Sequence, residues 1–525
     1  MPYSIEKKLA SLAANVDELT LNRSLMGVEK ESLRVNAQGS LAQTPHPEAL
    51  GSALTHPQIT TDYSEGLLEL ITPPLESVSE VMGFLSDLQT FVYQNLDDEF
   101  LWATSMPCVV AGEAGIPLAR YGSSNLGKMK TAYRRGLGHR YGRVMQVIAG
   151  VHFNFSYAQS FWDSLQSLEQ DHSASDVYRS QRYFDLLRNL QRVGWIIPFL
   201  FGASPAVCKS FLNGRTTTLA SFDETTYYDP WATSLRMGDI GYQNNLEAET
   251  GVKASYDSLD AYVNSLRQAI TTPCPRYQKI GIERDGEFQQ LNANILQIEN
   301  EYYSTVRPKQ PPRGMEMPTV SLARRGVQYI ELRSLDVNAF HPLGIDEDQL
   351  RFVEMLMLYC LLLPSDNISA AERKTIDQNE MIVAHMGRKP ELRLQREGQQ
   401  VALAHWAGEI MDQMHGIAEI YDQTHGGNQY QTALNHMLAR VRQPELTPSA
   451  VMLDMMRDQG VGFYHWAHEM SMQHQKTFLQ SRLSEQKEQS LRQMAMNSLQ
   501  QQREIEMNDK LPFAEFLQSY FSQTI

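Results

Sequence analysis

The segment Val151-His152-Phe153-Asn154-Phe155-Ser156 alternates strictly between apolar and polar side chains. Successive side chains of a β-strand point to opposite faces, so the alternation predicts a half-buried strand with its three apolar residues on one face. His152, Asn154 and Ser156 then share the other face. A sheet with one apolar and one polar face is typical of antiparallel strands, which can leave one side open to water.

A second segment with the period of a strand lies far along the chain, at residues 329–335 (YIELRSL). Its period of two places Ile330 and Leu332 on one face. Glu331 and Arg333 share the opposite face, so this strand presents an acid and a base side by side.

Two more apolar segments near the N-terminus contain carboxylates. Residues 28–33 (VEKESL) place Glu29 and Glu31 on a common face, and Glu69 stands among four aliphatic residues in the run LLELI, shortly after Asp62. Burying an ionised carboxylate is costly unless the group is paired, hydrogen-bonded or bound to a cation. The acidic positions therefore need a physical explanation.

Two explanations of these carboxylates stay open on residue chemistry alone. In the first, the strands have one solvated face, on which Glu and Arg alternate outward and His152 is an ordinary half-buried histidine. In the second, the polar faces converge in a cup that holds divalent cations, for which oxygen ligands favour Mg²⁺ or Mn²⁺, and Arg333 stabilises a transferring phosphoryl group. The cup would be formed by Glu29, Glu31, Asp62, Glu69, His152 and Glu331.

The overall charge excludes several classes of partner. The 525 residues include 46 Lys+Arg and 61 Asp+Glu, which gives a net charge of −15, and basic residues form no run. Binding to nucleic acid or to an anionic membrane surface is therefore not expected, and the ligands should be small molecules. Residues 352–363 form the longest apolar stretch, but Glu354 interrupts it and it is far shorter than the ~20 residues of a membrane helix. The N-terminus lacks the apolar core of a signal peptide, so we expect a cytoplasmic protein.

Cysteine and histidine patterns indicate neither a disulfide framework nor a zinc site. The four cysteines are far apart and include no Cys-x-x-Cys pair, as expected in a reducing compartment. Cys108 follows a proline in an apolar segment, and we interpret it as a small buried residue and not as a nucleophile. His465, His468 and His474 could share a helix surface, but no carboxylate at ligand spacing completes a zinc motif.

The stretch Gly122-Ser123-Ser124-Asn125-Leu126-Gly127-Lys128 matches the first seven positions of a phosphate-binding P-loop. The eighth position is Met129, where a hydroxyl should bind Mg²⁺, and no convincing buried strand precedes the loop. We therefore reject a P-loop. A glycine-rich loop near anionic substrate, with Lys128, Lys130, Arg134 and Arg135 close by, remains plausible.

A change of composition divides the chain near residue 345. Of the 24 Met, 15 fall in the last 180 residues, whereas 8 of the 32 Gly do, which predicts packed helices there. We expect a catalytic sheet-and-helix region at 1–345 and a helical region packed on it at 346–525. Ser369 with Glu372, and Thr447 before Pro448, are helix starts. Upstream, helical spacing predicts a helix over residues 78–92, and the polar tail 476–510 predicts a solvent-facing helix.

These same segments resemble the proteobacterial type of bacterial glutamate–cysteine ligase. The resemblance covers most of residues 25–345, and its motifs occur in order and are together highly specific. The matching stretches are residues 27–35, 46–72, 121–155, 232–236, 296–301 and 329–336.

The resemblance implies a fold class, an activity and a set of ligands. The fold would be α+β, with a curved, mainly antiparallel sheet of the glutamine synthetase type that forms a funnel, packed helices and a helical C-terminal part. The activity would be ATP-dependent ligation of the glutamate γ-carboxylate to the amino group of cysteine through a γ-glutamyl phosphate, the first step of glutathione synthesis. The alternative is a related ligase that joins glutamate to a different amine. Mg²⁺ or Mn²⁺ and ATP are implied, without an obligatory protein partner.

The resemblance also implies roles for individual residues. Family members place metal ligands in these motifs, and the positions here are Glu29, Glu31, Asp62, Glu69, His152 and Glu331. The substrate pocket corresponds to Tyr63, Tyr133, Tyr242 and Tyr303, and the phosphate and glutamate contacts to Arg134, Arg236 and Arg333, of which Arg236 and Arg333 would be catalytic. Family members often have phenylalanine where Tyr63 stands, so the hydroxyl is an addition to the presumed cysteine pocket.

Overall fold

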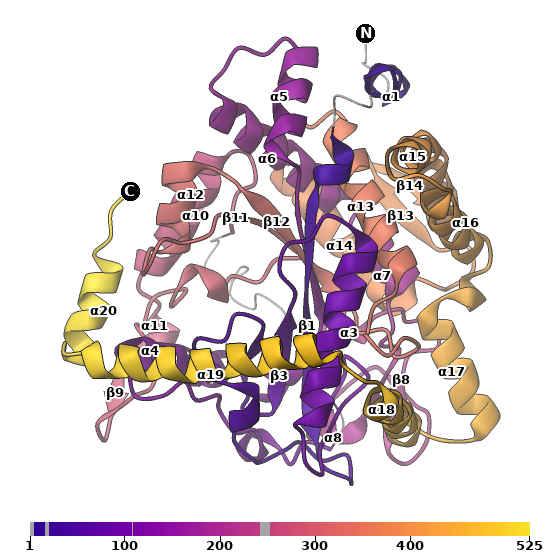
Figure 1. Cartoon of the computed structure of the whole chain (residues 1–525). Coiled ribbons are helices and arrows are strands. Elements are labelled where there is room, and N and C mark those ends of the chain that lie inside the picture. The colour runs from indigo at the N-terminus through magenta and orange to yellow at the C-terminus, as the bar shows by residue number, and fades with distance from the viewer. Residues whose placement is uncertain (1–4, 16–19, 108, 242–252) are drawn as a thin grey trace.

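The alternating segments assemble into one antiparallel sheet at the centre of the fold (Figure 1). The computed structural model describes residues 5–15, 20–107, 109–241 and 253–525, and two residues considered above, Cys108 and Tyr242, lie outside these ranges. Within the described residues the sheet has seven strands in the order β11-β12-β5-β1-β3-β2, with β4 paired to β1. The strands are β1 (Leu25–Val35), β2 (Ile59–Thr61), β3 (Leu67–Ile71), β4 (Phe100–Leu101), β5 (Val151–Ser156), β11 (Val306–Lys309) and β12 (Tyr329–Leu335).

The strand register brings the polar residues of different strands onto a common face. Glu29 on β1 pairs with His152 on β5, and Asn154 pairs with Glu331 on β12. Directly opposed residues of an antiparallel pair point to the same side of a sheet. The second explanation given above, in which polar faces of distant segments converge, therefore describes the fold correctly.

The apolar face of the same strands is buried in the main hydrophobic core. Val28, Phe153 and Leu332 are at most 1 % exposed, and they share this core with residues of α3 (Val78–Gln94) and α13 (Glu347–Leu362). At roughly 1.5–3 kcal/mol for each large apolar side chain that is fully buried, this face supplies the stability that the charged face does not.

Helices surround the sheet (Figure 1). The predicted helix over 78–92 is α3, in which Ser77 caps the first turn. The other helices before residue 345 are α1 (Ile5–Ala14), α4 (Asn125–Tyr141), α5 (Gln159–Leu168), α6 (Ser175–Val193), α7 (Ile196–Phe201), α8 (Lys209–Leu212), α10 (Leu259–Thr271), α11 (Pro275–Gln278) and α12 (Pro318–Arg325).

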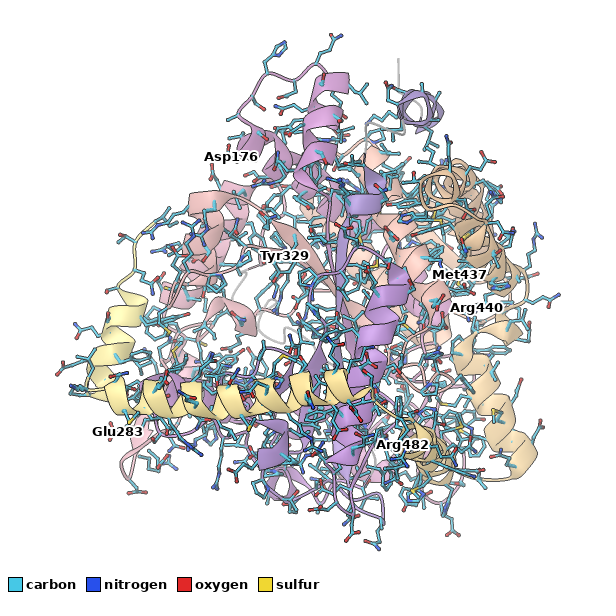
Figure 2. All side chains as sticks on the ribbon, in the orientation of Figure 1. Asp176, Glu283, Tyr329, Met437, Arg440 and Arg482 are labelled. Carbon is cyan, nitrogen blue, oxygen red and sulfur yellow. The ribbon has the colours of Figure 1, made fainter. Side chains whose placement is uncertain are left out.

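The last third of the chain is helical, as its composition predicts. Its helices after α13 are α14 (Ala370–Met386), α15 (Leu403–His425), α16 (Gln429–Arg442), α17 (Pro448–Gln459), α18 (Phe463–Gln480), α19 (Glu485–Asn508) and α20 (Phe513–Phe521). In Figure 2, Met437 and Arg440 mark α16 on the side away from α20. The helix starts at Ser369 and Thr447 are confirmed. The division at residue 345 stays a prediction, since the main hydrophobic core contains residues from both parts.

Short hairpins and small sheets complete the fold. A three-stranded sheet has the order β6-β8-β7, and β9 pairs with β10 and β13 with β14. Among the described residues, no helix is both long and apolar enough to cross a membrane. The bounds are β6 (Ala206–Cys208), β7 (Ala220–Ser221), β8 (Thr226–Tyr228), β9 (Glu283–Arg284), β10 (Glu287–Phe288), β13 (Arg393–Arg396) and β14 (Gln399–Ala402).

Three expectations need correction, two about single residues and one about the polar tail. His474 is buried, 7 % exposed, so it shares no exposed helix surface with His465. Burial lowers the pKa of His474 to about 4. Cys208 is disulfide-bonded, which the wide spacing of the cysteines did not predict, whereas Cys274 and Cys360 are buried free thiols. The tail predicted as one solvent-facing helix is two helices, α18 and α19, and Leu491 and Ser498 of α19 are buried.

Candidate active site

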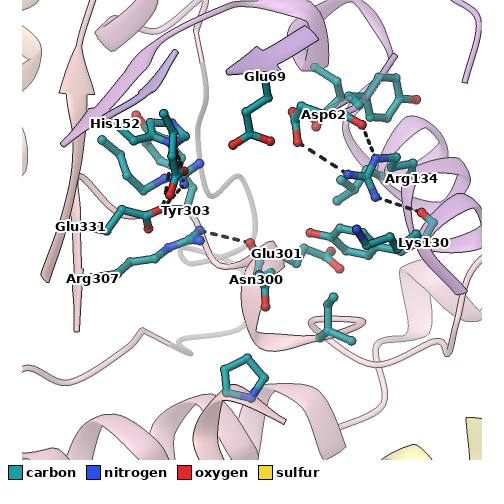
Figure 3. A pocket seen from close by; sticks show the side chains of 18 of the residues that line it. Asp62, Glu69, Lys130, Arg134, His152, Asn300, Glu301, Tyr303, Arg307 and Glu331 are labelled. Carbon is teal, nitrogen blue, oxygen red and sulfur yellow. Dashed lines mark hydrogen bonds and ion pairs between the residues drawn. The ribbon is translucent and has the colours of Figure 1, made fainter. Parts of the chain in front are cut away.

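A polar pocket of about 530 Å³ opens on the charged face of the sheet (Figure 3). The strands β1, β3, β5 and β12 form its floor, and α4 forms one wall. Every site residue that the sequence predicted within the described ranges lines this pocket. They are Glu29, Glu31, Asp62, Tyr63, Glu69, Tyr133, Arg134, His152, Arg236, Tyr303, Glu331 and Arg333. Tyr242 lies outside the described residues.

Three side chains in the pocket are close enough to share one metal ion. One ligand atom from each of Glu29, His152 and Glu331 lies within 4.8 Å of the other two. His152 Nδ1 lies 3.1 Å from Glu29 Oε2 and 3.8 Å from Glu331 Oε1. Asn154, two residues after His152 on β5, donates a 2.8 Å hydrogen bond from Nδ2 to Glu29 Oε1. This hydrogen bond holds the Glu29 carboxylate in place.

Two further carboxylates face each other beside this group. Glu31 on β1 and Glu69 on β3 are directly opposed, an arrangement that is destabilising for like charges. Gly150 N–H donates a 2.7 Å hydrogen bond to Glu31 Oε2, and His152 Nε2 lies 3.6 Å from Glu31 Oε1. Figure 3 shows Glu69 projecting into the pocket beside Asp62, across from Glu331.

The pKa values of two of these carboxylates, Glu69 and Glu331, are shifted in opposite directions. Burial raises the pKa of Glu69 well above its usual value, and repulsion from Glu29 and Asp62 raises it further. Burial also acts to raise the pKa of Glu331, but Lys309 and Arg333 outweigh it and hold the pKa well below the usual range. Glu331 is thus paired with protein cations, whereas the attraction of Arg134 does not offset burial and repulsion at Glu69, and a bound cation would relieve that repulsion.

Basic side chains border the carboxylates on the β12 side. Arg333 Nη1 lies 3.1 Å from Glu331 Oε1, and Lys309 Nζ lies 2.9 Å from Glu331 Oε2. Arg236 Nη2 donates a 2.8 Å hydrogen bond to the Arg333 carbonyl oxygen, and Arg236 is 5 % exposed. The Nε atoms of Arg236 and Arg333 are buried and have no hydrogen-bond partner among the described residues. Both guanidinium groups therefore keep donors free for an anionic ligand.

Gly150 makes the position of Arg236 possible. A Cβ atom on Gly150 would lie 2.1 Å from Arg236 Nη2. Any side chain at residue 150 would therefore displace the guanidinium group. The glycine that ends the loop before β5 thus gives the arginine access to the pocket.

The wall formed by α4 contributes a second charged group. Arg134 Nε donates to the carbonyl oxygen of Asp62, and its Nη2 lies 3.7 Å from Asp62 Oδ1. Its guanidinium carbon lies 4.6 Å from the centre of the Tyr121 ring, and Lys130 Nζ lies 4.8 Å from the same ring. These contacts orient two cations of one helix toward the carboxylate side of the pocket.

The aromatic part of the pocket comes from separate elements. Tyr133 belongs to α4, and Tyr303 Oη lies 3.5 Å from Met237 Sδ. The Tyr63 side chain is 1 % exposed, and a Cβ on Gly138 would lie 2.5 Å from Tyr63 Oη. The hydroxyl that Tyr63 adds relative to phenylalanine is therefore accommodated against a glycine of α4.

The lysine of the rejected P-loop lies outside the pocket. Lys128 is exposed and does not line the pocket, whereas Lys130 does.

Two basic residues of the pocket were not predicted from the sequence. Arg307 and Lys309 line the pocket from β11. Their alternation with Val306 and Pro308 is a signal of a strand, although four residues with a proline make it weak.

The donor set fits a hard divalent cation. Glu29 and Glu331 supply carboxylate oxygens, His152 supplies one nitrogen, and further carboxylates stand close to them. Oxygen-rich sites suit Mg²⁺ and Mn²⁺, and such ions leave coordination positions for phosphate oxygens. Arg236 and Arg333 add the charge that a transferring phosphoryl group needs.

Comparisons with known proteins agree with this chemistry. The sequence model of the glutamate–cysteine ligase family matches residues 9–383. The glutamate–cysteine ligase of Alcanivorax borkumensis is 47% identical over 522 residues, which are 98% of this chain and 99% of that protein. The glutamate–cysteine ligase of Azotobacter vinelandii is 46% identical over 524 residues, which are 99% and 98% of the two chains.

Solved structures show the same relationship. The crystal structure of the glutamate–cysteine ligase of Francisella tularensis in complex with AMP superposes with a TM-score of 0.89 at 36% identity, and covers 95% of this chain and 97% of that chain. A bifunctional glutathione synthetase from Pasteurella multocida has a TM-score of 0.72 at 23% identity over 90% of this chain and 55% of that chain, which shows a shared fold. The expected α+β class with an antiparallel sheet is confirmed.

Proposed function

This chain belongs to the glutamate–cysteine ligase family, and we propose that the pocket between the sheet and α4 is its active site. The enzyme joins glutamate to cysteine in an ATP-dependent reaction that forms γ-glutamylcysteine, the first step of glutathione synthesis. Its substrates are therefore small molecules, and the AMP complex of the Francisella tularensis relative supports ATP as a co-substrate.

One observation supports the location of the site best. Four adjacent strands, β12, β5, β1 and β3, each place at least one carboxylate or histidine on the same face, with Arg236 and Arg333 beside them. A surface that only faced water would not need five carboxylates around a histidine in a partly enclosed pocket, because the mutual repulsion of the carboxylates is costly. Binding of cations and phosphates explains the arrangement.

We assign the cation ligands to Glu29, His152 and Glu331, with Glu31, Asp62 and Glu69 completing the set. A divalent ion held there would neutralise the charge that gathers on the phosphate oxygens during transfer. The oxygen-rich donor set favours Mg²⁺ or Mn²⁺.

The remaining side chains orient the reacting groups. The glutamate γ-carboxylate attacks the γ-phosphorus of ATP, so a carboxylate oxygen–phosphorus bond forms, the bond to the ADP oxygen breaks, and γ-glutamyl phosphate results. Arg236 and Arg333 hold the phosphoryl oxygens with the donors that they keep free. The neutral cysteine amine then attacks the acyl carbon, a C–N bond forms, the bond from the acyl carbon to the phosphate oxygen breaks, and phosphate and the amine proton are released. We assign Tyr63, Tyr133, Tyr242 and Tyr303 to the substrate pocket and Arg134 to an anionic group of a substrate.

A coupled assay of ADP release tests this proposal. With glutamate and Mg²⁺ present, cysteine should give faster ADP release than other amines, and the product should carry a γ-glutamyl bond by mass spectrometry. Equal rates with a cysteine analogue that lacks the thiol would instead favour the ligase with a different amine. The full-length similarity to glutamate–cysteine ligases does not favour that alternative.

Two further expectations belong to this proposal. We propose that activity needs no obligatory protein partner, which size-exclusion chromatography with an assay of each fraction would test. Because the reaction consumes ATP, we propose a cytoplasmic location, which cell fractionation would test.

A further inference from the structure

The last 41 residues form an arm that reaches the active site from outside the part matched by the family model. The arm, residues 485–525, consists of α19, α20 and the C-terminal residues, and the family match ends at residue 383. Arg482 marks the turn before it in Figure 2, and α19 crosses the body toward α4 in Figure 1.

Two acidic side chains of the arm contact the start of α4. Asp509 accepts from the backbone N–H of Asn125, and its Oδ1 accepts a 2.6 Å hydrogen bond from Asn125 Nδ2. Glu506 Oε1 accepts a 2.7 Å hydrogen bond from Ser123 N–H. Asn125 also donates through Nδ2 to the carbonyl oxygen of Leu511 at 2.8 Å, and it is 3 % exposed.

These contacts satisfy groups that the helix itself leaves open. The first N–H groups of an α-helix have no partner within the helix, and negative charge is favourable at this end. The adjacent residue Ser124 caps the helix by accepting a hydrogen bond from Gly127 N–H, whereas Asn125 N–H donates to Asp509 of the arm. The hydrogen bond from Ser123 also lowers the pKa of Glu506, which keeps this group charged.

The arm and the start of α4 are in direct contact at Gly122. A Cβ on Gly122 would lie 2.2 Å from Gln502 Nε2 and from Glu506 Oε1, and the residue has φ +81°. One turn earlier on α19, Ser498 Oγ accepts a 2.9 Å hydrogen bond from Ser52 N–H. The arm is therefore fixed on the body at several points before it reaches Asp509.

The arm also contacts a second segment that lines the pocket. Gln523 Oε1 accepts from Met317 N–H at 3.0 Å, and Gln523 Nε2 donates to the Met315 carbonyl oxygen at 2.8 Å. Leu517 packs in a cluster with Met129 of α4, and Tyr520 lines the pocket itself. The arm thus connects α4 with the segment around Met315, which also lines the pocket.

The helix that the arm holds is the one that carries cations into the pocket. Lys130, Tyr133 and Arg134 follow Asn125 by one to three turns on α4. Arg134 Nη1 donates to the Lys130 carbonyl oxygen at 3.1 Å, so the guanidinium group moves with the helix. A helix is stiff over this length, and a displacement of its first turn is passed on to Arg134.

We propose that Asp509 is a positioning residue of the ligase reaction: by holding the first turn of α4, it sets the place of Arg134 and Lys130 against the anionic substrates. This proposal rests on the assignment of the pocket as the active site. It gives the C-terminal arm a role in substrate binding that its polar, largely exposed surface does not suggest.

The test compares Asp509→Asn with Lys487→Met. Lys487 lies at the other end of the same arm, away from the pocket, and makes an ion pair with Asp87 of α3. Removal of this ion pair therefore controls for a general loosening of the arm. Asp509→Asn should raise the KM for ATP or glutamate about tenfold, because small displacements of positioning groups cost one to two orders of magnitude. Lys487→Met should leave both KM values unchanged. Thermal unfolding is recorded for each variant.

A double variant distinguishes positioning from general stabilisation. If Asp509 acts through Arg134, the loss in Asp509→Asn should be less than multiplicative with that in Arg134→Lys, since independent sites are additive in free energy.

Hydrogen exchange of α4 tests the structural part without turnover. Asp509→Asn should speed exchange of the α4 amides, whereas Lys487→Met should not. Unchanged hydrogen exchange and KM in folded Asp509→Asn, or fully multiplicative losses with Arg134→Lys, would each overturn the proposal. An inactive wild type would instead overturn the assigned function, while the exchange result would still test the arm.

Discussion

His152 Nδ1 lies 3.1 Å from Glu29 Oε2 across the paired strands β5 and β1, although 123 positions separate the two residues in sequence. The same nitrogen lies 3.8 Å from Glu331 Oε1 on β12. The three groups are held by strand register and not by a flexible loop. Pre-organisation of this kind is what a metal site for phosphoryl transfer requires.

Glu331→Gln should leave the fold intact and lower turnover by at least ~10²-fold, because the amide keeps the shape but removes the charge of the proposed metal ligand. Steady-state ADP release at saturating Mg²⁺, with circular dichroism as the folding check, measures this. Glu488→Gln, on the exposed face of α19, is the matched control. Near-normal activity of Glu331→Gln would return the residue to an ordinary solvated strand face.

Arg333→Lys should lower kcat severely even though the positive charge remains. Arg333 uses Nη1 for Glu331 and keeps Nε free of hydrogen bonds within the described residues, so its planar fork can serve both a carboxylate and a phosphoryl oxygen. Lysine has one compact ammonium group and cannot do both. Single-turnover and steady-state rates check this, and a loss smaller than twofold would show that only charge matters at residue 333.

The fate of Lys128 distinguishes the metal cup from the rejected P-loop. Lys128 is exposed and outside the pocket, so Lys128→Ala should retain turnover, with a small rise in KM that shrinks as salt increases. His152→Ala should lose most activity. Kinetics of both folded variants provide the comparison. An inactive Lys128→Ala variant together with an active His152→Ala variant would instead indicate that the loop at residues 122–128 binds the ATP phosphates.

Glu354, which lies far from the pocket, should make the free energy of unfolding depend on pH. It is buried in α13, accepts a 2.7 Å hydrogen bond from Tyr430 Oη, and burial raises its pKa to about 8 from 4.5. The folded state thus holds this proton more tightly than the unfolded state. The contribution to stability is complete below pH 4.5 and falls by about 1.4 kcal/mol per pH unit as pH rises toward 8.

The check is a comparison of Tm for the wild type and Glu354→Gln, which lacks this titration. The difference, wild type minus variant, should decrease between about pH 5.5 and about pH 7.5. All other titrating groups are common to both proteins and cancel. A difference that does not change with pH would mean that Glu354 is not protonated in the folded state.

Sequence predicted the strands of the charged face because their signal is local. The alternation in β5 and β12 depends only on which side chains face the core. Register is different, since nothing in residues 28–33 specifies that Glu29 pairs with His152. The convergence of these groups therefore followed from the family resemblance, and sequence spacing alone left it open.

The misses have equally physical causes. Lys309 lies on a four-residue edge strand that contains a proline, too short to show a period. The buried face of α19 consists of Leu491, Ala495 and Ser498, and small or polar residues do not produce an apolar stripe. Such a face packs closely because Gly51 opposite it has no side chain, where a Cβ would lie 2.4 Å from Ser498 Oγ.

We propose that Glu29, His152 and Glu331 hold the divalent cation of the ligase reaction. Titration of the wild type and Glu331→Gln with Mn²⁺, followed by electron paramagnetic resonance of the free ion, measures this directly. The variant should bind Mn²⁺ at least about tenfold more weakly than the wild type while remaining folded. Equal affinity of the two proteins for Mn²⁺ would contradict it.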